Sequence, residues 1–164
     1  HHHNDHGGGI RPYVTSGATL VVHETATEFY QAQSSRPQSR VLMDALDRNP
    51  QSVKIIGVAA GDSYTIEDPT QSVSVYPVLG GHTEDMVVAV LEKQSMLYAG
   101  DLYVSGIARD LRSGTKRGPN VLPFHSAVAL DETIRAYDLD VPILVGSHDR
   151  QPVTYQDLVN YITD

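Results

Sequence analysis

The hydrophobic and polar positions along the chain predict short strands mixed with short helices. Residues 18–24, ATLVVHE, are rich in β-branched and apolar side chains, which indicates a buried strand. A helix is expected after Thr27, through residues 28–33. Apolar residues at helical spacing predict a further helical segment within 35–50, which Asn49-Pro50 ends.

The middle of the chain has the alternation and the turn residues of an antiparallel sheet. Three strands are expected to form a meander, over residues 53–59, 62–68 and 72–79. Two more strands, over residues 86–92 and 95–101, are expected to form a hairpin across Lys93-Gln94.

The last third of the chain predicts helices around one more strand. Residues 104–130 carry glycine and proline and predict a long loop with a helical piece. A helix that starts at an Asp131 N-cap, a strand over 141–148 and a final amphipathic helix capped by Thr154 follow. No stretch has the composition of a linker, so residues 1–164 are expected to form a single α/β domain.

Composition and charge limit the classes of function. The chain has 164 residues and a formal net charge of −8, from 12 Lys and Arg against 20 Asp and Glu. Nucleic acids and anionic membranes bind basic surfaces, so neither is an expected partner. No apolar run approaches the length of a membrane-spanning helix, and the sequence assigns no compartment. Since cysteine is absent, any metal must be held by His, Asp or Glu.

Histidines gather at the start of the chain, in the stretch HHHNDHGGG. In an extended segment residues i and i+2 point the same way, so His1 and His3 can bind one ion while His2 faces away. Asp5 and His6 follow at a turn and can reach a second ion. A purification tag also leaves consecutive histidines, but a tag does not supply Asp5 and His6.

Three further residues of the metal-binding type stand at the ends of predicted strands: His82, Asp101 and His148. Layered α/β proteins build their binding sites at such strand ends. His23, by contrast, lies on an apolar strand and is expected to be a packed, hydrogen-bonded histidine. Tyr103 is expected to be an ordinary structural tyrosine.

These motifs resemble those of the metallo-β-lactamase superfamily. HHHNDHGGG fits the H-x-H-x-D-H pattern of that family, and GGH (80–82), AGD (99–101) and GSH (146–148) stand in the order and rough spacing of its remaining ligands. The similarity also covers GGGIRPYVTSGATLVVHE and HTEDMVVAVLEKQSMLYAGDLY, so it spans nearly the whole chain. The resemblance implies an αβ/βα sandwich in which a half-domain of strands precedes the motif. The expected fold is therefore incomplete at its N-terminal side and corresponds to the C-terminal portion of the full fold.

The resemblance also implies a dinuclear metal site. The implied ligands are His1, His3 and His82 for one metal, Asp5, His6 and His148 for the second, and Asp101 as the bridge between them. Two zinc ions are expected, with iron or manganese as alternatives, because a His/Asp shell does not select strictly. The metal pair would lower the pKa of a bridging water to give hydroxide at neutral pH. Asp5 would be the catalytic residue that orients this nucleophile or relays its proton.

Three hypotheses of function follow from the resemblance. The first is a dinuclear metallohydrolase whose metal-bridged hydroxide cleaves an ester, lactone, lactam or thioester of a small molecule. The second is a non-catalytic half-domain or interaction subunit that retains the metal-ligand residues. It would pair its open sheet edge with another chain, either in a homo-oligomer or with a separate N-terminal chain. The third is an oxygen-dependent or redox member of the same fold that uses iron.

Overall fold

The computed structural model describes residues 1–36, 42–105 and 122–163. Its larger sheet has six strands that neighbour one another in sequence order. They are β3 (Tyr64–Glu67), β4 (Ser72–Pro77), β5 (Val87–Leu91), β6 (Met96–Gly100), β7 (Ile143–Gly146) and β8 (Val153–Thr154). All neighbours are antiparallel except β6 and β7, which are parallel. The expected hairpin across Lys93-Gln94 is confirmed as β5–β6, joined by the short helix η2 (Glu92–Gln94).

A second, two-stranded sheet pairs β1 (Thr19–His23) with β2 (Lys54–Val58) in parallel. The strand expected over 53–59 is therefore present, but its expected place in a meander with β3 and β4 is wrong. The crossover from β1 to β2 contains η1 (Glu24–Ala26), α3 (Thr27–Ser35) and α4 (Ala45–Arg48). Short turns after β2 suggested a meander, whereas the continuous apolar runs of β1 and β2 suit a parallel pair.

Two helical expectations are confirmed in part. Helix α3 matches the helix expected after Thr27. Of the segment expected within 35–50, α4 is the helical part that the structure describes, and it ends before Asn49-Pro50 as expected. Residues 37–41, and residues 106–121 of the expected long loop, lie outside the described part of the chain.

The C-terminal helices give one correction and one confirmation. Helix α6 (Leu122–Ala136) begins well before Asp131, so the expected N-cap at Asp131 is wrong. Asp131 is buried inside the helix, where it accepts hydrogen bonds from Arg135 Nε (2.8 Å) and the hydroxyl of Tyr155 (2.5 Å). The cap at Thr154 is confirmed, because its Oγ accepts a hydrogen bond from Asp157 N–H (3.1 Å) at the start of α7 (Tyr155–Thr163).

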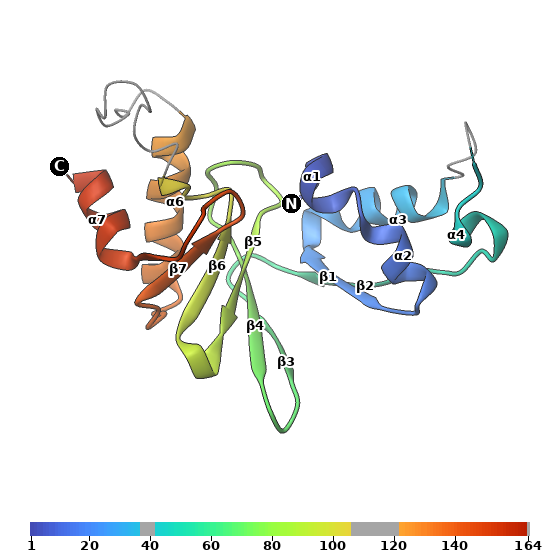
Figure 1. The fold of residues 1–164 in the computed structure, drawn as a ribbon, viewed down its shortest axis with the longest axis horizontal. Helices are drawn as coiled ribbons and strands as arrows, with labels where there is room; N and C mark the ends of the chain where they lie inside the picture. The colour runs from blue at the N-terminus through green and yellow to red at the C-terminus, as the bar shows by residue number, and fades with distance from the viewer. Residues whose placement is uncertain (37–41, 106–121, 164) are drawn as a thin grey trace.

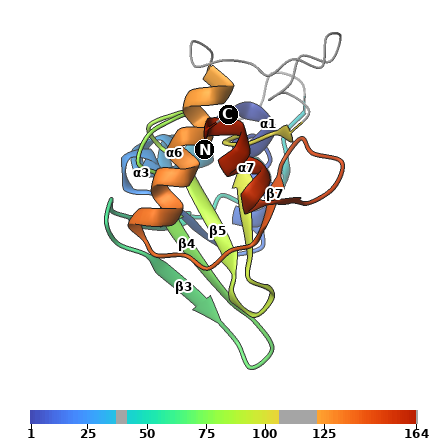
Figure 2. The same ribbon diagram turned by 90° about the vertical axis from the view of Figure 1, so that its left-hand side faces the viewer.

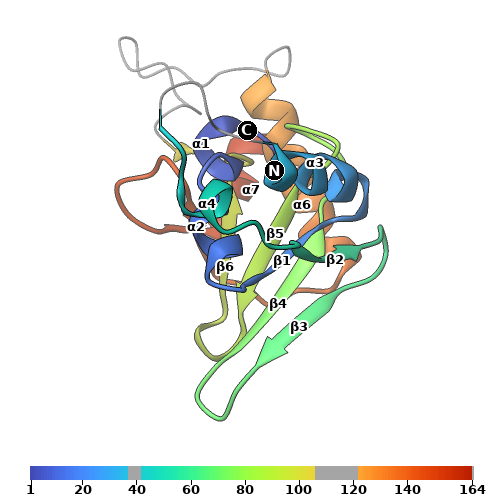
Figure 3. The same cartoon turned by 90° about the vertical axis from the view of Figure 1, so that its right-hand side faces the viewer.

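The elements stack as helix, sheet, sheet, helix. Helices α6 and α7 cover one side of the larger sheet (Figures 1 and 2). The smaller sheet lies on the other side with α3, α4, α1 (Asn4–Gly7) and α2 (Ile10–Thr15), as Figure 3 shows. The main core fills the space between the larger sheet and α6 and α7, with Leu97, Leu130 and Leu158 fully buried. The α/β class and the αβ/βα layering are therefore confirmed.

Membrane spans and domain organisation are the two remaining sequence predictions. Among the described residues, no helix has the length and apolar character needed to span a membrane. The single-domain organisation of residues 1–164 stays a prediction.

Candidate metal centre

The N-terminal histidines lie on a short segment that turns into α1. The carbonyl oxygen of His3 accepts hydrogen bonds from the N–H groups of His6 (3.0 Å) and Gly7 (2.7 Å). This turn brings the rings of His1 and His6 to within 4.3 Å, measured between centroids. A side chain on Gly7 would collide with Tyr30, because the hydroxyl oxygen of Tyr30 lies 2.8 Å from the position of a Cβ atom. Glycine therefore permits the close approach of α1 to α3.

The remaining candidate ligands lie where strands of the larger sheet end. Asp101 follows β6 directly, and His148 lies in the turn after β7. The N–H group of Ser147 donates to the carbonyl oxygen of Gly100 (2.9 Å), which joins these two strand ends. His82 lies in the β4–β5 connection, which passes beside the N-terminus in Figure 1.

Two groups of His and Asp side chains in the described part of the chain could each hold a metal ion. One group contains His1, His3, His82 and Asp101, and the other contains Asp5, His6, Asp101 and His148. Within each group the candidate ligand atoms lie within 4.8 Å of one another, and Asp101 belongs to both. The structure thus brings the sequence-predicted residues together in the two predicted sets. Their role as metal ligands stays a prediction.

Contacts inside the cluster fit bound cations. Asp101 Oδ2 lies 3.0 Å from His6 Nε2 and 3.7 Å from His1 Nε2. His1 Nε2 and Asp101 Oδ1 are nevertheless buried without a hydrogen-bond partner, although His148 Nε2 lies 3.3 Å from Asp101 Oδ1. An unpaired buried polar atom costs about 1–3 kcal/mol and is rare. Lone pairs that converge without donors are what a cation would satisfy.

The surroundings of His82 favour its neutral imidazole. Its Nε2 faces His3 Nδ1 at 3.1 Å. Burial lowers the pKa of His82 below its ordinary value; His3 and His6 act in the same direction, and Asp101 opposes them. Neutral imidazole is therefore favoured at neutral pH, and this is the form that binds metals.

The sequence did not predict the contacts that hold the N-terminal segment in place. Asp85 Oδ2 accepts a hydrogen bond from the His2 N–H group (2.9 Å), and Asp85 Oδ1 lies 2.8 Å from His2 Nδ1. His2 therefore faces away from both metal groups, as expected. The contact ties the segment of His1 and His3 to the connection that carries His82. No spacing could have revealed it, since the two residues lie far apart along the chain.

Tyr30 provides a second contact to the same segment. Its hydroxyl donates to the carbonyl oxygen of His1 (2.9 Å). Burial, followed by the charge of Asp85, raises the pKa of Tyr30 to about 12, so the hydroxyl keeps the proton that it donates.

The other singled-out side chains have structural partners. His23 is buried, and its Nδ1 accepts a hydrogen bond from Thr25 N–H (3.2 Å), so the expectation of a packed histidine is confirmed. Tyr103 is a buried core residue whose hydroxyl donates to the carbonyl oxygen of Asp157 (3.3 Å), as expected of a structural tyrosine.

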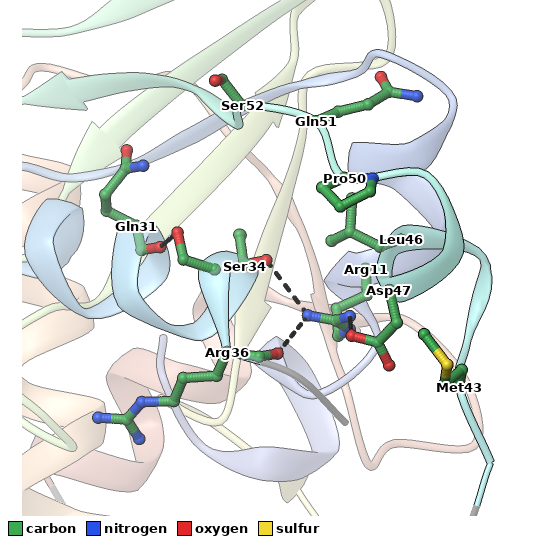
Figure 4. A pocket seen from close by; sticks show the side chains of 11 residues that line it. Arg11, Gln31, Ser34, Arg36, Met43, Leu46, Asp47, Pro50, Gln51 and Ser52 are labelled. Carbon is green, nitrogen blue, oxygen red and sulfur yellow. Dashed lines mark hydrogen bonds and ion pairs between the residues drawn. The ribbon is translucent and has the colours of Figure 1, made fainter. Parts of the chain in front are cut away.

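A cavity of about 460 Å³ lies between α2, α3 and α4 and shares no residue with the metal groups (Figure 4). Arg11 lines it and donates hydrogen bonds to Asp47 Oδ1 (2.8 Å) and to the carbonyl oxygens of Ser34 (3.2 Å) and Arg36 (2.8 Å). Asp44 accepts from the same guanidinium at both carboxylate oxygens. Since protein acceptors occupy these donors, we interpret Arg11 as a structural residue.

One family model matches most of the chain. The family model described as "Metallo-beta-lactamase superfamily" matches residues 1–148. No curated protein matches the chain significantly. Among solved structures, a metallo-beta-lactamase from Pontibacter korlensis is 20% identical with a TM-score of 0.60. The match covers 99% of this chain and 65% of that protein. One from Hirschia baltica is 18% identical with a TM-score of 0.61, at 99% and 64% coverage.

A third similar structure has a different function. The chemotaxis sensor ODP from T. denticola, in its apo state, is 12% identical with a TM-score of 0.63, and 100% of this chain covers 65% of that chain. A second structure of ODP is described as a peroxy diiron species. The chain thus spans just under two thirds of the length of these three proteins.

Proposed function

The chain belongs to the metallo-beta-lactamase superfamily, and on this premise we propose that it is a dinuclear, zinc-dependent hydrolase of small acyl compounds. The observation that carries the proposal is the carboxylate of Asp101. It belongs to two groups of side chains that could each hold a metal ion, and one of its oxygens is buried without a hydrogen-bond partner. A carboxylate in this position suits a bridge between two ions.

In this proposal each side chain of the two groups has a role in holding the metal ions. His1, His3 and His82 would hold the first ion, and Asp5, His6 and His148 would hold the second, with Asp101 contributing to both groups. When bound, the metal pair supplies water activated to hydroxide at neutral pH and a Lewis acid for the substrate oxygen.

Asp5 is the proposed catalytic residue. Its side chain is 59% exposed, and its Oδ2 lies 3.6 Å from both His6 Nε2 and His148 Nε2. The carboxylate therefore has access to solvent at the edge of the cluster. From this position Asp5 orients the nucleophile or holds its proton.

Zinc is the proposed metal because the donors are imidazole and carboxylate groups and the sequence has no cysteine. Zinc binds this donor set well, whereas thiolate sites are excluded. Iron and manganese accept the same donors, so metal identity has to be measured.

The proposed reaction is hydrolysis of an ester, lactone, lactam or thioester. The oxygen of water joins the acyl carbon, the bond from that carbon to oxygen, nitrogen or sulfur breaks, and the leaving group takes up a proton. A net charge of −8 makes the phosphate backbone of a nucleic acid an unfavourable substrate.

The test is an activity screen of the zinc-loaded chain against one ester, one lactone, one β-lactam and one thioester. We expect the His148→Ala variant to lose more kcat/KM than the about 10–100-fold typical of losing an outer-shell partner. His125→Ala is the matched control, since His125 is an exposed histidine of α6 that belongs to neither metal group. Full activity in the His148→Ala variant, or in protein stripped by a chelator, would contradict the proposal.

A second candidate is a diiron protein of redox or sensor function. The similarity in fold to the chemotaxis sensor ODP favours it, and the His and Asp donors suit iron. Iron rather than zinc in protein purified without added metal, together with no cleavage in the activity screen, would favour this candidate over the hydrolase.

A further inference from the structure

A second cavity, of about 240 Å³, adjoins the candidate metal centre. Three of its lining residues, His82, Asp101 and His148, also belong to the metal groups. The others come from the segment after β6 and from the first turns of α6. These residues are Leu102, Tyr103, Val104, Leu122, Pro123 and Ser126.

The lining away from the metal groups is apolar. Leu102, Val104, Leu122 and Pro123 carry no polar side-chain atom. The hydroxyl of Ser126 donates to the carbonyl oxygen of Leu122 (3.0 Å) inside the helix. The described lining contains no Lys or Arg. A charged or strongly polar group buried against these four apolar side chains would lose its hydration without gaining a partner, whereas an alkyl group would gain free energy.

Two of the apolar side chains that line the cavity are buried in the core of the protein. Leu102 is 1% exposed and Val104 is 9% exposed. The β4–β5 connection packs against the same lining, because a Cβ atom on Gly81 would lie 2.8 Å from Ala129 Cβ and 3.3 Å from Leu102 Cδ2. Gly81 has a φ of +100°, which favours glycine. His82 follows it directly, so the position of this candidate ligand and the shape of the cavity depend on the same packing.

We propose that this cavity binds the apolar acyl chain of the substrate, so that the hydrolase selects acyl compounds with a short linear alkyl group. This inference rests on the proposed function and deepens it by naming the substrate class. The volume is below the about 300–1,000 Å³ of drug-sized ligand pockets. A cavity of this size suits a short alkyl chain, and we take hexanoyl to octanoyl as the lengths to test.

The first measurement compares p-nitrophenyl esters of acetate, butyrate, hexanoate, octanoate and laurate. We expect kcat/KM to rise roughly fourfold per added methylene, the value of burying one methylene, and to stop rising at hexanoate to octanoate. The second measurement is independent of activity. Calorimetry follows the binding of butyrate, hexanoate and octanoate to the metal-loaded chain, and the affinity is expected to rise with chain length in the same way.

Two variants and one control test the location. Leu122 is the first residue of α6 and is 51% exposed, so Leu122→Asp changes the cavity without burying a charge in the core. This variant is expected to lose most of the dependence on chain length. Val104→Ala enlarges the cavity and is expected to shift the preference to longer chains. Ile66→Asp is the control, because Ile66 is also 51% exposed and lies on β3, outside the cavity.

The outcomes separate this inference from the proposed function. Esters that are cleaved at one rate whatever their length, with carboxylate affinities that are also equal, would overturn the inference and leave the hydrolase. If no ester is cleaved but carboxylate affinity rises with chain length and falls in Leu122→Asp, the acyl cavity is supported and the hydrolase is wrong. If no ester is cleaved and carboxylate affinity does not depend on chain length, both the acyl cavity and the hydrolase are wrong.

Discussion

Asp85 is the residue on which the position of the N-terminal histidines depends most directly. Its side chain contacts both the backbone N–H group and the ring of His2, at 2.9 Å and 2.8 Å. Since Asp85 is buried, water competes weakly for these contacts. His2 stands between the two candidate ligands His1 and His3, so a displaced His2 displaces both.

We expect the Asp85→Ala variant to bind zinc about tenfold more weakly, the lower end of what partners outside the ligand shell contribute. The affinity is measured by competition with a chromophoric chelator. Glu84→Ala is the matched control, because Glu84 is the exposed acidic neighbour of Asp85. Equal affinities in the two variants would show that Asp85 does not position the metal centre.

Candidate ligands could be named from the sequence because the motifs around them resemble those of a known family. The absence of cysteine and the position of three of them at predicted strand ends agreed with that resemblance but did not select the set. The contacts of Asp85 and Tyr30 could not be predicted. An aspartate or a tyrosine has many possible partners, and a hydrogen bond between residues far apart in the sequence leaves no periodic pattern.

At the scale of elements, local patterns predicted most strands but not all of their pairings. Short turns separate β3 from β4 and β5 from β6, so these two antiparallel pairings follow from the sequence. The pairing of β4 with β5 across residues 78–86 was not predicted. Strand β2 is also followed by a short turn, yet it pairs with β1 across an intervening helical segment. The start of α6 differs from the prediction because Asp131 has the chemistry of a cap. In the structure Asp131 lies inside α6, where it pairs with Arg135 one turn further along the same helix and with Tyr155 of α7.

Helix α4 has only four residues and depends on its N-cap, Asp44. Asp44 Oδ1 accepts a hydrogen bond from the N–H group of Asp47 (2.8 Å), and its carboxylate also accepts from the guanidinium of Arg11. The hydrogen bonds from Arg11 hold the pKa of Asp44 well below its ordinary value of 3.8. The ion pair therefore links α4 to α2.

This lowered pKa predicts how stability depends on pH. A carboxyl group whose pKa is depressed by folding stabilises the fold above its unfolded-state pKa and stops doing so as pH falls through its folded-state pKa. Asp44→Asn keeps a residue that caps helices but removes the charge. Urea denaturation is expected to show the wild type more stable than Asp44→Asn at neutral pH, with the difference shrinking below about pH 4. In the control Asp62→Asn, an exposed turn residue, no such narrowing is expected. If the difference in stability between the wild type and Asp44→Asn did not change with pH, the lowered pKa of Asp44 would be contradicted.

At the scale of the whole molecule, the residues of the candidate metal centre come from both halves of the fold, the half with the smaller sheet and the half with the larger sheet. His1, Asp5 and His6 come from the N-terminal segment and α1, whereas Asp101 and His148 follow strands of the larger sheet. Ions bound to both sets would cross-link the two halves. Metal binding should then stabilise the whole fold rather than one loop.

Metal removal is therefore expected to lower the melting temperature. A ligand at a free concentration of about 100 Kd stabilises a protein by about 2.7 kcal/mol. At about 2–4 °C per kcal/mol for a chain of this size, the shift is roughly 5–11 °C. Differential scanning fluorimetry with and without a chelator measures it. Asp101→Asn is expected to show little metal-dependent shift, and an unchanged melting temperature for the wild type would contradict the cross-linking role.

The proposal that this chain holds two metal ions that share Asp101 is tested most directly by the metal stoichiometry. Elemental analysis after zinc loading and removal of free metal is expected to give about two equivalents per chain for the wild type. His148→Ala is expected to keep about one equivalent, and His125→Ala about two. No bound zinc in the wild type, or two equivalents retained in His148→Ala, would contradict the account.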